Sequence, residues 1–150
     1  MKKVKKNLHL QCINFVENRF QTIQNTIKEI QESLGTETKS SAGDKHETGR
    51  AMLQLEREKV GNQLAEIQKI KEVLFKINIE SHSEQIGLGS VVYTSKANYF
   101  IAISAGELQL GNELFYAISA STPIAKLLLG KTIGDQINFR DKGFKIIKVF

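Results

Sequence analysis

Residues 13–34 read INFVENRFQTIQNTIKEIQESL and contain a continuous heptad pattern. Its apolar members alternate in spacing between three and four residues: Ile13, Val16, Phe20, Ile23, Ile27, Ile30 and Leu34. This spacing is typical of a helix that pairs with another helix in a coiled coil. We expect Gly35 to end the helix, because the segment 35–43 that follows is rich in Gly, Ser and Thr and has the composition of a loop.

A second helical pattern runs from about Glu47 to Phe75. Its apolar residues lie on one side: Leu53, Val60, Leu64, Ile67, Ile70 and Leu74. Because the connection between the two patterns is short, we expect two antiparallel neighbouring helices. At 1.5 Å per residue, each arm has a length of about 40 Å. One pair of helices buries only one face of each, so the hairpin must project from a domain or insert into another molecule.

The second half of the chain changes to the alternation of strands. We expect strands at 90–94, 99–103, 114–118, 136–139 and 144–149, with hairpin turns at 95–98 and 140–143. One short helix is expected between the third and fourth of these strands. Its signals are Thr122 as the N-cap, Pro123 at the first helical position and Gly130 at the stop, and Ile124, Leu127 and Leu128 are expected to face the sheet.

The pattern therefore predicts an α+β protein with two domains. Residues 1–77 form an antiparallel coiled-coil hairpin, and residues 78–150 form a small, mostly antiparallel β domain with one short helix. The segment from about Asn78 to Leu88 is the expected hinge, and Gly87 and Gly89 allow the chain to turn.

The charge and cysteine content favour an intracellular protein with an acidic partner. The 150-residue chain has a formal net charge of +5, with one basic cluster at residues 2–6, which suits an acidic partner or nearby nucleic acid. Cys12 is the only cysteine, which excludes an intrachain disulfide. We interpret it as a half-buried thiol. We see neither a secretory signal nor a membrane-spanning stretch, so we expect a cytoplasmic protein.

The sequence Gly43-Asp44-Lys45-His46-Glu47 falls at the turn of the predicted hairpin. One interpretation is structural: Asp44 caps the second helix and Glu47 completes a capping box. The other is that the two carboxylates hold a divalent cation such as Mg²⁺, with a partner supplying the remaining ligands. A cap can still present its free oxygens, so the two are compatible. His46 has no second His or Cys at ligand spacing, so we do not expect zinc.

The basic residues near this turn also have two interpretations. Lys45 and Arg50 either keep the tip soluble or contact RNA phosphates. Elsewhere, Gly87-Leu88-Gly89 precedes a strand and does not form a phosphate loop. We find no Ser/His/Asp or Cys/His set that could be assigned to nucleophilic catalysis.

The layout and two motifs together resemble the Gre family of bacterial transcript cleavage factors. In that family a coiled coil carries a Gly-Asp-x-x-Glu tip, which Gly43, Asp44 and Glu47 match here. Residues 121–131 resemble the family's Ser-Pro-Ile-Ala-x-x-Leu-Ile-Gly-Lys segment, with one residue inserted before Pro123, and 144–150 resemble its last strand. The chain departs from the family after Glu47, where it has Thr-Gly-Arg-Ala in place of the usual Asn-Ala-Glu-Tyr.

The resemblance implies an FKBP-like C-terminal domain and a transcription elongation factor that binds RNA polymerase and passes its coiled coil through the secondary channel. It further implies that Asp44 and Glu47 help to hold a Mg²⁺ ion in the polymerase active site, next to the 3′ end of the nascent RNA, and that the polymerase then cleaves backtracked RNA. It assigns docking to the C-terminal domain, where we expect contacts from Pro123, Ile124, Lys126 and Lys131. The resemblance also implies that the chain completes the polymerase's own site, so we expect neither a free-standing enzyme nor a small-molecule substrate.

Two alternatives stay open. A protein of the same shape could bind the polymerase and block its channel without stimulating cleavage. A coiled-coil adaptor unrelated to transcription could use the same tip only as a helix cap.

Overall fold

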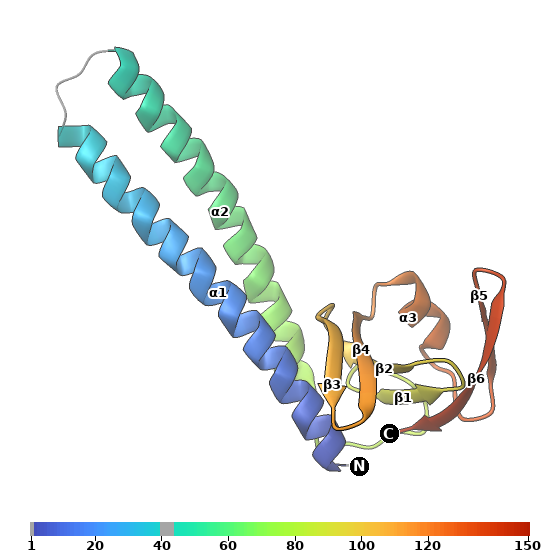
Figure 1. The fold of residues 1–150 in the computed structure, drawn as a ribbon. Coiled ribbons are helices and arrows are strands. Elements are labelled where there is room, and N and C mark those ends of the chain that lie inside the picture. The colour runs from blue at the N-terminus through green and yellow to red at the C-terminus, as the bar shows by residue number, and fades with distance from the viewer. Residues whose placement is uncertain (1, 40–43) are drawn as a thin grey trace. The chain divides into compact units, whose positions relative to one another are not determined.

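The computed structural model describes residues 2–39 and 44–150, and side chains at 2–36 and 48–150 (Figure 1). Two long helices, α1 (Lys2–Lys39) and α2 (Asp44–Lys76), come first. Six strands and one short helix follow in the order β1 (Val91–Thr94), β2 (Asn98–Ala102), β3 (Gly106–Leu110), β4 (Glu113–Ser119), α3 (Pro123–Leu128), β5 (Gln136–Phe139) and β6 (Lys142–Val149). The predicted α+β class is confirmed.

The chain divides into two compact units. One contains the described residues between Val16 and Ile70, and the other contains α1 up to Phe15 together with Lys71–Phe150. The start of α1 and the end of α2 therefore belong to the same unit as the strands. The predicted domain boundary between residues 77 and 78 stays a prediction.

In the unit from Val16 to Ile70, α1 and α2 lie side by side as an antiparallel pair (Figure 1). Near the connection, the Arg50 guanidinium Nη1 donates a hydrogen bond of 3.2 Å to the Leu34 carbonyl. Farther along, Ile23 of α1 lines the same groove as Ile67 and Ile70 of α2. This order of contacts is that of an antiparallel hairpin, as predicted.

The predicted apolar seam forms the interior of this pair. Val16, Ile30, Val60 and Ile67 are buried, and the other seam residues of the unit are half-buried: Phe20, Ile23, Ile27, Leu34, Leu53, Leu64 and Ile70. Half-burial is the expected result when two helices have no third layer beside them, because each seam side chain is covered from one direction only.

The two helices extend closer to their connection than predicted. Helix α1 continues past Gly35 to Lys39, so the prediction that Gly35 ends it is wrong. A glycine inside a helix costs only about 1 kcal/mol relative to alanine, which a long helix tolerates. Helix α1 includes Thr36, whose hydroxyl donates a hydrogen bond to the Glu32 carbonyl at 3.1 Å. Helix α2 begins at Asp44, slightly before the predicted start near Glu47.

The strands form one sheet in the order β3-β4-β2-β1-β6-β5. All neighbours are antiparallel except β2 and β4, which run parallel with Phe100 opposite Ala117. The five predicted strands are present. The prediction missed β3, whose Leu108 is buried and pairs with Phe115 of β4. Its sequence, Gly-Glu-Leu-Gln-Leu, carries too little apolar or β-branched character to identify a strand locally.

Both predicted hairpin turns are present. Between β1 and β2, the Thr94 backbone N–H donates to the Ala97 carbonyl at 3.1 Å. Between β5 and β6, Arg140 and Asp141 have φ angles of 51° and 64°. Left-handed conformations at two successive residues produce the turn whose twist matches a two-residue β-hairpin.

One face of the sheet packs against α3. Val92, Ile101 and Ile146 from the strands form a cluster with Ala125 and Leu128 from the helix. Helix α3 begins as predicted: the Thr122 hydroxyl accepts a hydrogen bond from the Ala125 N–H at 3.3 Å, and Pro123 is the first helical residue. Ile124 and Leu128 face the sheet as expected. The same expectation for Leu127 is wrong, because that side chain is 39% exposed.

The opposite face of the sheet is covered as well. Val91, Phe100 and Phe115 are fully buried, and Val91 and Phe100 are next to Val92 and Ile101, so they point to the other side. Leu8 and Cys12 of α1 are also fully buried.

Two hydrogen bonds hold the start of α1 in this unit. Gln11 Nε2 donates to the Gln109 carbonyl of β3 at 3.0 Å. His9 Nε2 lies 2.9 Å from the Leu74 carbonyl of α2. The ends of the long helices therefore form part of the core that includes the strands.

We predict that Cys12 is unreactive in the folded protein. The side chain is fully buried rather than half-buried, and burial raises the pKa of its thiol to about 12. At pH 8 only about one thiol in 10⁴ is then the nucleophilic thiolate. Mass spectrometry after iodoacetamide treatment should show negligible alkylation of the native protein and rapid alkylation in denaturing guanidinium. Rapid alkylation under native conditions would contradict the buried position.

Candidate functional site

The first candidate site is the start of α2. Asp44 is the first residue of the helix and Glu47 lies in its first turn, where α1 and α2 are joined through residues 40–43. Carboxylates in a first turn are favoured by the unpaired N–H groups and the positive end of the helix dipole. Gly43 and the side chains of Asp44, Lys45 and Glu47 lie outside what the structure describes, so their metal and RNA roles stay predictions.

Arg50 has a structural role beside this turn. Its Nη1 donates to the Leu34 carbonyl, and the side chain is half-buried. This contact ties the first turns of α2 to the last turns of α1. The predicted contact between Arg50 and RNA stays a prediction, and the structure shows that the guanidinium also stabilises the hairpin.

The second candidate site is the α3 segment in the other compact unit. Pro123, Lys126 and Lys131 are exposed, whereas Ile124 is half-buried against the core cluster. The backbone of Lys131 is held on both sides, because its N–H donates to the Leu128 carbonyl at 3.0 Å and its carbonyl accepts from the Ile86 N–H at 2.8 Å. The two lysine side chains are therefore presented to solvent from a firmly held segment.

Exposed apolar side chains lie close to these lysines along the chain, and the sequence analysis did not identify them as a contact surface. Leu127 is 39% exposed, Leu129 is 36% exposed and Ile133 is 54% exposed. The run of three leucines at 127–129 could have indicated that at least one of them is exposed. Successive helical residues point about 100° apart, so three adjacent leucines cannot all face one sheet.

The described residues contain neither a metal-binding cluster nor a membrane-spanning helix. Among the side chains that the structure describes, no three His, Cys, Asp or Glu residues are grouped closely enough to hold a metal ion. Within the same part of the chain, no helix is both long and apolar enough to cross a membrane.

Comparisons with known proteins add a weak structural similarity. No family model and no curated protein matches the chain. One solved structure, described as that of the transcription factor Gfh1, aligns with 94% of this chain and covers 92% of its own chain, at 20% sequence identity and a TM-score of 0.34.

Proposed function

We propose that this chain is a transcription elongation factor that binds RNA polymerase, inserts the tip of its α1–α2 hairpin into the secondary channel, and stimulates Mg²⁺-dependent cleavage of backtracked RNA. The observation that carries the proposal is the position of Asp44 and Glu47 in the first turn of α2, at the turn of a long two-helix hairpin. The family resemblance of the tip and of residues 121–131 supports the same function.

The dimensions of the hairpin suit insertion into a channel. Helix α2 has 33 residues, which corresponds to a length of about 50 Å. Each helix has a diameter of about 10–12 Å with its side chains, so a pair is a narrow rod. The apolar seam between the helices stiffens it, while the outward positions are mostly polar and exposed. Such a rod carries the two carboxylic residues at the end where its helices are joined.

The donor set fits Mg²⁺ only when a partner shares the ion. Mg²⁺ prefers oxygen ligands and keeps several of its waters, and two carboxylates alone bind it weakly. Asp44 and Glu47 would hold the ion together with ligands from the polymerase. In a two-metal site, the bound ions activate the attacking water and stabilise the leaving oxygen of a phosphodiester. This chain would then complete the polymerase's own nuclease site and would have no free-standing hydrolase activity.

The α3 segment supplies the proposed docking surface on the rim of the channel. Lys126 and Lys131 offer positive charge, and the exposed Leu127, Leu129 and Ile133 offer apolar area beside it. An apolar centre with charged residues around it is the usual composition of a protein–protein contact.

Arg50 favours the channel-blocking regulator as a second candidate. The resembled family has a second acid at this position and an aromatic residue after it, whereas this chain has Arg50 and Ala51. Arg50 adds a positive charge near the tip and is bound to the Leu34 carbonyl. A positive charge there opposes metal binding, so the same shape could occupy the channel without stimulating cleavage.

RNA cleavage in a purified, backtracked elongation complex tests the proposal. With Mg²⁺ present, adding the protein should release short 3′ fragments and allow the polymerase to resume elongation, whereas the complex alone should cleave slowly. Binding to polymerase without faster cleavage would favour the channel-blocking regulator. Failure to bind polymerase at all would leave the coiled-coil adaptor.

A further inference from the structure

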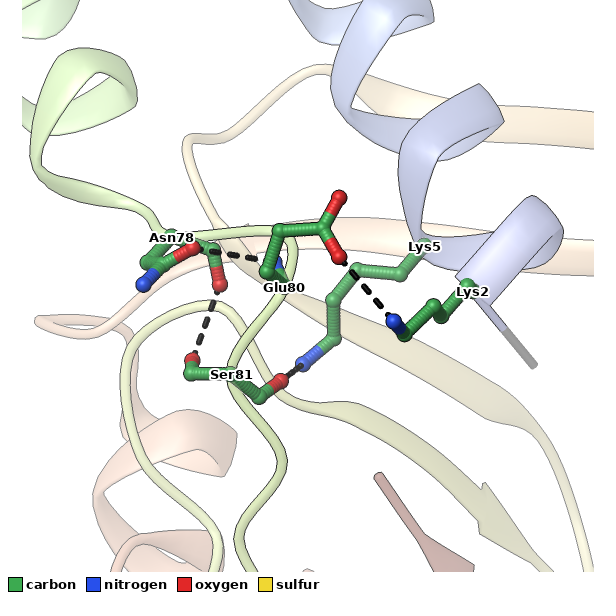
Figure 2. A network of polar contacts seen from close by, with 5 residues as sticks. All are labelled: Lys2, Lys5, Asn78, Glu80 and Ser81. Carbon is green, nitrogen blue, oxygen red and sulfur yellow. Dashed lines mark hydrogen bonds and ion pairs between the residues drawn. The ribbon is translucent and has the colours of Figure 1, made fainter.

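Lys5 is a positively charged residue that is only 5% exposed. Its Nζ donates one hydrogen bond, of 3.0 Å, to the Ser81 carbonyl (Figure 2). An ammonium group has three donors. Among the residues that the structure describes, Nζ has no further hydrogen-bond partner and no carboxylate within ion-pair distance. A buried cation without a counter-ion is costly, and the pKa of Lys5 is lowered by this burial.

The segment facing Lys5 is held by its own hydrogen bonds. The Asn78 side-chain oxygen accepts from the Glu80 N–H at 2.9 Å, and the Asn78 carbonyl accepts from the Ser81 hydroxyl at 2.8 Å (Figure 2). The same carbonyl also accepts from the Ser81 N–H at 3.1 Å. The Ser81 hydroxyl donates its proton within this turn, and among the described contacts no hydrogen bond joins its oxygen to Lys5. In this described turn, Lys5 therefore donates to the Ser81 carbonyl alone.

A small cavity of about 50 Å³ lies beside Lys5, and its lining includes Lys2, Glu80, His82 and Phe150. A water molecule needs about 10–15 Å³ of such volume, so the cavity has room for a few waters or one small ion. The lining thus brings two lysine side chains together with the aromatic residue Phe150.

Among the described side chains that line this cavity, Lys2 and Glu80 are paired with each other, and Lys5 has no partner of opposite charge. Glu80 lines it, but its carboxylate lies 3.1 Å from the Lys2 ammonium, and the side chains of the two are 68% and 79% exposed. An exposed pair of this kind is weak and leaves Lys5 uncompensated. The first turn of α1 contains no acidic residue, so its unpaired N–H groups add further positive potential.

We propose that this cavity binds a small monovalent anion, of chloride size and no larger than a single carboxylate group, with Lys5 as its main ligand and Lys2 as a second charge. The anion acts as the counter-ion of the buried ammonium. Because Lys5 is on α1 and Ser81 follows α2, the bound anion stabilises the contact between the start of α1 and the segment 78–82. This inference does not depend on the proposed function.

Thermal unfolding at constant ionic strength tests the site, with gluconate replaced stepwise by chloride. A ligand that binds only the folded state raises its stability with concentration, so the Tm of the unmodified protein should rise by a few degrees. Lys5→Met keeps the length of the side chain and removes the charge, and its Tm should not depend on which anion is present. Lys6→Met removes an exposed lysine from the same turn and should retain the full chloride effect.

Bromide locates the anion directly and does not require a variant to fold. Crystals of the unmodified protein grown in bromide should show an anomalous peak within hydrogen-bond distance of Lys5 Nζ. An anomalous map without that peak would overturn the proposal. A chloride dependence that is absent from the unmodified protein, or equal in Lys5→Met, would overturn it as well.

Discussion

Asp44→Asn should reduce the stimulation of RNA cleavage by about 100-fold or more, because even residues that only support metal ligands contribute about 10–100-fold. Asparagine keeps the size of the side chain and caps a helix about as well as aspartate. It removes the negative charge that a Mg²⁺ ligand provides. Polymerase binding and the thermal stability of the protein should therefore change little, and higher Mg²⁺ should partly restore cleavage.

Two further variants separate the chemical role from the capping role. Asp44→Ala should lose cleavage as well and, if Asp44 caps α2, should also lose about 1 kcal/mol of unfolding free energy. Glu56→Gln removes an exposed carboxylate farther along α2 and should leave cleavage unchanged. Undiminished cleavage by Asp44→Asn would remove the catalytic assignment and leave the channel-blocking regulator as the better interpretation.

Reversing the charges of Lys126 and Lys131 together should weaken polymerase binding by about tenfold or more, which corresponds to about 1.4 kcal/mol. Both side chains are exposed on the α3 segment, so the double change to glutamate should leave the fold intact. Placing like charges against an acidic docking surface is costly. Affinity should be measured by titrating polymerase with the labelled protein. At saturating concentrations cleavage should recover, because Asp44 and Glu47 are unchanged.

Lys142→Glu provides the matched control, since Lys142 is an exposed lysine of β6 outside the α3 segment. Its affinity should equal that of the unmodified protein. Point variants are a sharper test than removal of residues 78–150, because truncation would also expose Leu8, Cys12 and Leu74, which are buried in the same compact unit. Equal affinity for the double variant and the control would show that the docking surface lies elsewhere.

The hairpin could be predicted in detail because its information is local. Every seam residue from Val16 to Leu34 is buried or half-buried in the structure, as the heptad spacing required. The helix boundaries were less predictable. The glycine that suggested a stop at residue 35 is tolerated inside α1, since one unfavourable residue is outweighed by the turns on either side.

The candidate sites could likewise be predicted only where they depend on local sequence. The heptad patterns on both sides were sufficient to predict that Asp44 and Glu47 fall at the turn of the hairpin. In the α3 segment, the cap at Thr122 could be predicted from residue types, but the exposure of Leu127 could not. Exposure depends on how a six-residue helix is rotated against the sheet, and that rotation is set by the strands it packs on.

The sequence by itself thus determined the two long helices, five of the six strands, the cap of α3 and the acidic turn, because each depends on residues close together in the chain. Only the tertiary structure decided the order of the strands, the parallel pairing of β2 with β4, the assignment of β3, and the burial of Lys5, Leu8 and Cys12. These features depend on contacts between distant segments. The same lysine can be exposed or buried according to what packs against its helix, and the sequence around Lys5 is equally basic in either case.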